Sequence, residues 1–138
     1  MTDAMTPSHA HAQLAAQHAD LRDRIARCED LADGLDAGHI EPAQLLREVA
    51  DLRIAFDRHN QFEERLLRPI LLDADWLGAV RVARMVEDHA EEHRSMRRGL
   101  DTTTSAALRD VLADLRAHLD TEERYFLRRK VLRDDLAR

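Results

Sequence analysis

The sequence has few residues that interrupt helices and almost no cysteine. Among 138 residues there are four glycines, three prolines and one cysteine, Cys28. A single cysteine excludes a disulfide within the chain, which fits a reducing compartment. The scarcity of glycine and proline leaves long stretches in which a helix need not be broken.

Long apolar runs and an excess of positive charge are missing as well. No apolar run approaches the roughly 20 residues that a bilayer-spanning helix needs, and the N-terminus lacks the layout of a signal peptide. We therefore expect a cytoplasmic protein without a membrane partner. The formal net charge is −6, from 21 basic and 27 acidic residues. Because the charges are interspersed, no basic patch is available for a phosphate backbone, and we expect no nucleic-acid partner.

What remains is typical of an all-α protein. Hydrophobic residues make up 44% of the chain and charged residues 35%. Apolar side chains recur at alternating steps of three and four, which puts one buried stripe on each helix. The pattern predicts four helices in a single domain, residues 1–138, at about 8–37, 42–70, 75–100 and 104–134.

The predicted boundaries rest on helix caps and breakers. Gly38 follows the first stripe, and Pro42 opens the second at the first helical position, where proline is tolerated. Pro69 disfavours helical geometry just before it, so the second helix should end near residue 70. Residues 73–75 and 102–105 offer capping side chains for the last two helices. Short connections favour antiparallel neighbours and predict an up-down-up-down four-helix bundle.

Polar side chains interrupt the four apolar stripes at similar distances from the turns. Histidines and glutamates four residues apart share one helix face, so each pair can reach the same point. In chain order, the set is His18, His59, Glu63, His89, His93, His118 and Glu122. Buried without partners, these groups would cost several kcal/mol each. A metal-free polar layer could compensate, but imidazoles with carboxylates are also what first-row metals bind, and seven donors exceed one tetrahedral zinc.

The order and spacing of these motifs resemble the hemerythrin-like family, the HHE cation-binding domain. The likeness runs from His18 to the end of the fourth predicted helix. It implies two iron ions joined by an oxo or hydroxo bridge in the bundle core. By this resemblance, one iron would be bound by His89, His93 and His118, and the other by His18 and His59. The two bridging carboxylates would be Glu63 and Glu122.

Two of these assignments have an adjacent alternative. The oxygen-carrying hemerythrins of marine invertebrates place the last carboxylate five residues after the histidine, where this chain has Glu123. A step of four rotates by about 40° around the helix and a step of five by about 140°, so we prefer Glu122. The same geometry favours Glu63 over Glu64. Tyr125 is interpreted as a core residue, with a role at the iron site as the alternative.

The resemblance implies reversible binding of O2 or another small ligand, for carriage, storage or sensing. In that family the iron with fewer histidines has the open position. A second hypothesis is a di-iron enzyme that consumes peroxide or reduces nitric oxide. A third is iron sensing or storage through a partner protein. A purely structural bundle is the fourth, and a homodimer is left open.

Overall fold

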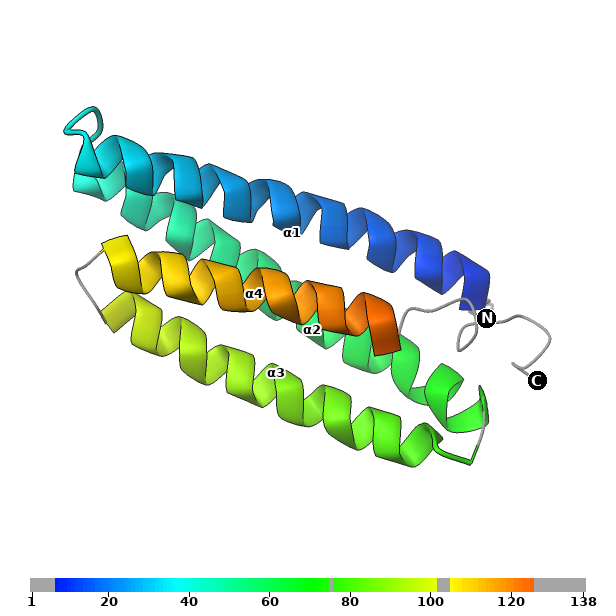
Figure 1. The fold of residues 1–138 in the computed structure, drawn as a ribbon. Helices are drawn as coiled ribbons and strands as arrows, with labels where there is room; N and C mark the ends of the chain where they lie inside the picture. The colour runs from blue at the N-terminus through cyan, green and yellow to red at the C-terminus, as the bar shows by residue number, and fades with distance from the viewer. Residues whose placement is uncertain (1–6, 75, 102–104, 126–138) are drawn as a thin grey trace.

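The computed structural model describes residues 7–74, 76–101 and 105–125. These residues form four helices and no strand: α1 (Pro7–Asp36), α2 (Pro42–Ala74), α3 (Gly78–Asp101) and α4 (Ser105–Tyr125). Each helix packs against the next one in the chain, and α4 packs against α1. Neighbours run antiparallel, so the last residues of α1 and α3 lie at one end of the molecule with the first residues of α2 and α4 (Figure 1). The predicted all-α, up-down-up-down bundle is confirmed.

The helix bounds differ from the predicted ones mainly at the α2–α3 connection. α2 passes through Pro69 and ends at Ala74, beyond the predicted end near residue 70. Proline removes one backbone donor, and a fully buried Leu67 anchors this part of the helix in the core. α3 begins at Gly78 rather than near residue 75. The predicted continuation of the fourth helix over residues 126–134 lies outside the described residues.

The α1–α2 connection is a tight helix end built around Gly38. Its φ is +74°, the left-handed conformation that glycine adopts without steric cost. The backbone N–H of His39 donates to the Gly34 carbonyl at 2.8 Å, and that of Gly38 donates to the Leu35 carbonyl at 3.0 Å. These bonds fix the point at which the chain reverses. They thereby set His18 of α1 level with His59 of α2.

Two apolar clusters fill the bundle on either side of a polar stretch. The larger one, here called the apolar half, contains Leu21, Ile25, Cys28, Ala32, Leu45, Val49, Leu52, Phe56, Leu108, Leu112, Leu115 and Leu119. The smaller one, the end cluster, contains Ala10, Leu14, Leu67, Val82 and Met85. On α1 the residue between the two clusters is His18, and on α2 His59 and Glu63 take that place. Within the described ranges, no helix combines the length and the apolar composition needed to cross a bilayer.

Candidate metal centre

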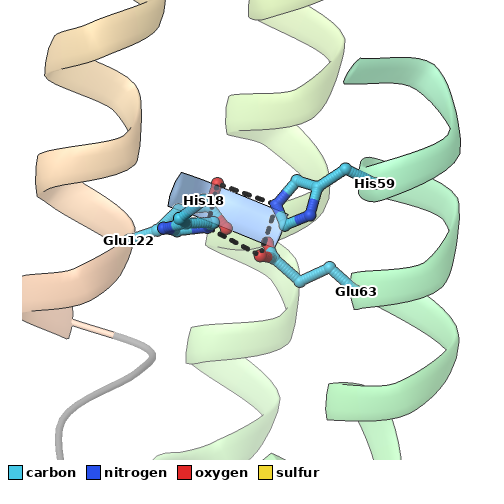
Figure 2. Close-up of side chains that lie close together, drawn as sticks. All are labelled: His18, His59, Glu63 and Glu122. Atoms are coloured by element: carbon cyan, nitrogen blue, oxygen red, sulfur yellow. Dashed lines mark ion pairs between the residues drawn. The ribbon is translucent and has the colours of Figure 1, made fainter. Parts of the chain in front are cut away.

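The polar stretch gathers donor groups from all four helices. His18, His59, Glu63 and Glu122 each offer one ligand atom within 4.8 Å of the others (Figure 2). A second group, made of His89, His118 and Glu122, meets the same criterion. The two groups share Glu122. We call the residues of both groups the polar layer.

In the first group, two imidazoles face two carboxylates. Glu63 Oε2 lies 3.1 Å from His59 Nε2 and 3.8 Å from His18 Nε2. Glu122 Oε1 lies 3.8 Å from His59 Nε2 and 3.9 Å from His18 Nε2. Figure 2 shows His59 and Glu63 projecting from α2 toward His18 and Glu122. All four side chains are buried, and Glu63 is 0% exposed.

The same two carboxylates also reach the second group. Glu63 uses its other oxygen, Oε1, which lies 3.0 Å from His89 Nε2. Glu122 Oε1 lies 2.6 Å from His118 Nε2. Each carboxylate therefore lies between a histidine of the first group and a histidine of the second. This is the placement that a carboxylate bridging two cations needs.

The outer nitrogens of three histidines are held by acceptors behind the rings. The pairs are His59 Nδ1 with Gln17 Oε1 at 2.7 Å, His89 Nδ1 with Glu64 Oε1 at 2.8 Å, and His18 Nδ1 with Glu123 Oε1 at 3.1 Å. When Nδ1–H donates a hydrogen bond outward, the lone pair of Nε2 faces the interior, where it can bind a metal ion. Glu64 and Glu123, the neighbours of the preferred glutamates, thus lie behind the histidines, whereas Glu63 and Glu122 lie inside.

The structure does not bring His93 into either group. Its side chain is 42% exposed, and its Nδ1 lies 3.3 Å from Asp57 Oδ1. Glu92, which also belongs to neither group, is buried, with Oε2 2.9 Å from His118 Nε2 and Oε1 accepting a hydrogen bond of 3.2 Å from Asn60 Nδ2. The sequence reasoning missed Glu92 and Asn60. The available signal was the His89-x-x-Glu92 spacing, because residues three apart share a helix face as residues four apart do.

Several polar atoms of the layer have short contacts without hydrogen-bond geometry. Buried atoms without a hydrogen-bond partner include the Nε2 atoms of His18, His59 and His118, Glu63 Oε2 and both carboxylate oxygens of Glu122. Each such atom costs about 1–3 kcal/mol when it stays unsatisfied. These atoms converge from different helices, and imidazole and carboxylate are ligands of first-row transition metals. The donor set therefore fits metal ions.

The electrostatics of the histidines favour a positive charge in the layer. Burial by itself would lower the pKa of His59, but Glu122 and Glu63 outweigh it and raise the pKa to about 9. Burial likewise opposes protonation of His118, but Glu122 and Glu92 raise its pKa to about 11. Imidazoles that hold protons at neutral pH mark the positions where cations are stabilised. A metal ion at these nitrogens would displace the protons.

The two inner carboxylates have opposite pKa shifts. Burial alone would raise the pKa of Glu63, yet its short contacts with Glu122 and with the surrounding histidines hold it well below its ordinary value. Burial, followed by the nearby charge of Glu63, raises the pKa of Glu122. Two carboxyl groups this close cannot both ionise easily without a cation between them. Of the two carboxyl groups, Glu63 therefore ionises more readily than Glu122.

The family model of the hemerythrin HHE cation-binding domain matches residues 9–129. The chain belongs to this family. Neither the comparison with curated proteins nor the comparison with solved structures gave a match. Membership in the hemerythrin family, together with the buried cluster of histidines and glutamates, supports a metal-binding protein.

Proposed function

We propose that this hemerythrin-family chain is a non-haem di-iron protein that binds O2 or another small diatomic ligand reversibly. The observation that carries the proposal is the pair of donor groups that share Glu122 inside the bundle. His18 and His59 would hold one iron, and His89 and His118 the other. Glu63 and Glu122 would join them, since each contacts histidines of both groups.

When bound, a pair of iron ions would supply a reversible two-electron exchange with a small ligand. The residues of this chain provide the conditions for such an exchange. The polar layer lies between the apolar half and the end cluster, which keep bulk water from the donors. Gln17, Glu64 and Glu123 fix the ring orientation of three histidines, so the donor atoms need not reorganise.

The balance of donor types favours reversible binding over O2 activation. Ferritin-like di-iron bundles use four carboxylates and two histidines. Here four buried or nearly buried imidazoles face two inner carboxylates. Neutral nitrogen donors stabilise a high metal charge less than carboxylates do, so the oxidised pair would return its electrons more readily.

A hollow between α1 and α2 gives small molecules a path toward the first group. Its volume is about 610 Å³, and its lining includes His59 and Gln17. The Gln17–His59 contact of 2.7 Å lies between this hollow and the buried carboxylates. A diatomic ligand is small enough to pass such a contact when the side chains move.

One observation favours a second candidate, a di-iron enzyme that consumes peroxide or reduces nitric oxide. Glu92 brings a third carboxylate to within 2.9 Å of His118, which shifts the donor set toward that of the ferritin-like enzymes. Assays for O2 evolution from peroxide and for loss of nitric oxide on iron-loaded protein test this candidate. Turnover in either assay would favour the enzyme over the carrier.

The decisive experiment is the visible spectrum of iron-loaded, anaerobically reduced protein before O2, after O2, and after O2 is removed. We expect a charge-transfer band that appears with O2 and vanishes on its removal. His59→Ala should lose the band, while His39→Ala, a substitution in the exposed α1–α2 connection, should keep it. Irreversible oxidation would contradict reversible binding, and a parent protein without bound iron would contradict the metal site itself.

A further inference from the structure

Helix α3 presents two adjacent titratable side chains near the polar layer, and only one is buried. Glu92 is 5% exposed, whereas the side chain of His93 is 42% exposed. A charged carboxylate is almost never fully buried unless it is paired or binds a cation. The half-exposed His93 ring is open to water on one side, and its Nδ1 lies 3.3 Å from Asp57 Oδ1, a buried oxygen without a hydrogen-bond partner.

The partners of Glu92 direct it toward the metal centre. Its Oε2 lies 2.9 Å from His118 Nε2, the nitrogen that also faces Glu122 at 2.6 Å. That oxygen has no partner with hydrogen-bond geometry. The other oxygen, Oε1, accepts a hydrogen bond from Asn60 Nδ2, and Asn60 is itself 3% exposed. Asn60 therefore holds one oxygen of the carboxylate, while the other oxygen faces His118 Nε2 in the interior.

We infer that Glu92, and not His93, is the second ligand that α3 contributes to the metal held by His89 and His118, with Asn60 as its positioning residue. The inference rests on the proposed function, since it requires a metal in the layer. It changes the donors at that position from three imidazoles to two imidazoles and a carboxylate. It also makes the two metal positions more alike, because each then has two histidines.

The surface next to Glu92 supplies a route for a cation. A pocket of about 300 Å³ between α3 and α4 has Glu92 and His118 in its lining. Other residues around it are Arg84, Asp88, Glu91, Ser95, Asp114, Leu115 and Thr121. Glu91 pairs with Arg94, which offsets its charge, while Asp88 and Asp114 add to the acidic lining. A cation entering here meets the carboxylates of Asp88, Glu91 and Asp114 beside the guanidinium of Arg84, with Glu92 as a buried carboxylate behind them.

The test compares two substitutions of equal kind, Glu92→Gln and His93→Gln. Glutamine keeps the volume of Glu92 and an oxygen for Asn60 while removing the ligand charge. Iron content per chain and anaerobic titration with Co²⁺, followed by its visible absorption, report stoichiometry and ligand type without reference to activity. We expect Glu92→Gln to weaken the binding of one of two Co²⁺ equivalents at least about tenfold and to change the cobalt spectrum. His93→Gln should change affinity less than about twofold.

The opposite pattern, with metal lost from His93→Gln and retained by Glu92→Gln, would overturn the inference while leaving the proposed metal centre intact. A parent chain that binds neither Fe²⁺ nor Co²⁺ would overturn both. Loss of metal in the two variants alike would also overturn it, because His93 would then be a ligand too.

A melting experiment separates a ligand from a merely structural carboxylate. The quantity to compare is the rise in Tm that Co²⁺ causes in each variant. A structural role would lower Tm with and without metal by the same amount and leave that rise unchanged, which would contradict the inference. We expect the rise to shrink most in Glu92→Gln, less in Asn60→Ala, and not at all in His93→Gln.

Discussion

The apolar half and the polar layer are two ways of filling the same four-helix interior. In the apolar half, buried side chains from α1, α2 and α4 are stabilised by packing against one another. In the polar layer, buried nitrogens and oxygens face one another at short distances while many lack a hydrogen-bond partner. The first region is complete with the amino-acid chain alone. The second is arranged for groups that the chain does not contain.

This difference indicates what each region contributes. Burial of apolar surface stabilises the bundle at about 25 cal/mol per Å², whatever is bound. The polar layer contributes less, since its charged groups lose hydration on burial, and ion pairs within the layer or a bound cation must offset that cost. Stability and metal binding thus depend on different segments of the bundle. Substitutions in the apolar half should lower the free energy of unfolding, whereas substitutions in the polar layer should lower the metal content.

The largest effect on metal binding is expected from Glu63→Ala. Glu63 belongs to the first group and contacts His59 and His89 with different oxygens, so its loss removes a carboxylate that reaches histidines of both groups. Iron content per chain should fall by half or more, as measured by elemental analysis of reconstituted protein. His39→Ala, in an exposed turn, serves as the control and should keep the parent's iron. An unchanged iron content in Glu63→Ala would show that this carboxylate is not a ligand.

The largest effect on stability without an effect on metal is expected from Leu45→Ala. Leu45 is 5% exposed in the apolar half, far along α2 from the polar layer. Removing a buried leucine side chain costs about 2–5 kcal/mol, measurable by urea unfolding. The neighbouring Leu46 is 62% exposed, and Leu46→Ala should change stability by less than about 0.5 kcal/mol. Metal loss in folded Leu45→Ala would break the proposed separation of the two regions.

A smaller effect is expected from pH, and it should reverse when metal is present. The pKa of His59 is raised to about 9 and that of His118 to about 11, against 6.5 in an unfolded chain. Their contribution to stability is complete below about pH 6.5 and is lost as pH rises through the folded-state values. Unfolding of metal-free protein in a chelator should therefore become easier from pH 7 to 9.

With Co²⁺ present, the stabilisation by metal should instead increase over the same pH range, since bound cations displace those protons. Thermal melts at pH 6.5, 7.5 and 8.5, with chelator and with Co²⁺, measure both trends. Metal-free protein that grows more stable between pH 7 and 9 would argue against protonated histidines in the layer.

The smallest effect is expected from the surface ion pair of Arg116 and Glu29. Two contacts of 2.6 and 3.0 Å join α4 to α1, but the side chains are 39% and 33% exposed. Partly solvated pairs of this kind contribute about 0–1 kcal/mol. Arg116→Ala should lower the free energy of unfolding within that range, less so in high salt, and leave the iron content unchanged. A loss above about 2 kcal/mol would mean that this contact, rather than the core, sets the packing of α1 on α4.

Local rules were sufficient for the helices and for most of the polar layer. The recurrence of apolar residues at steps of three and four follows from 3.6 residues per turn, so it places His18, His59, Glu63, His89, His118 and Glu122 on inward faces without reference to any neighbour. Short connections then determine antiparallel packing. The confirmed bundle and the family membership therefore agree with what the sequence alone predicts.

The tertiary structure decided between residues that helix periodicity alone cannot distinguish. Glu92 and His93 follow His89 by three and four residues and flank its direction on opposite sides, so periodicity cannot choose between them. The choice depends on how α3 is rotated against α2 and α4. That rotation brings Glu92 to Asn60 and His118 and leaves His93 beside Asp57 at the surface. The continuation of α2 past Pro69 was decided in the same way, since burial of Leu67 against other helices outweighs one lost backbone hydrogen bond.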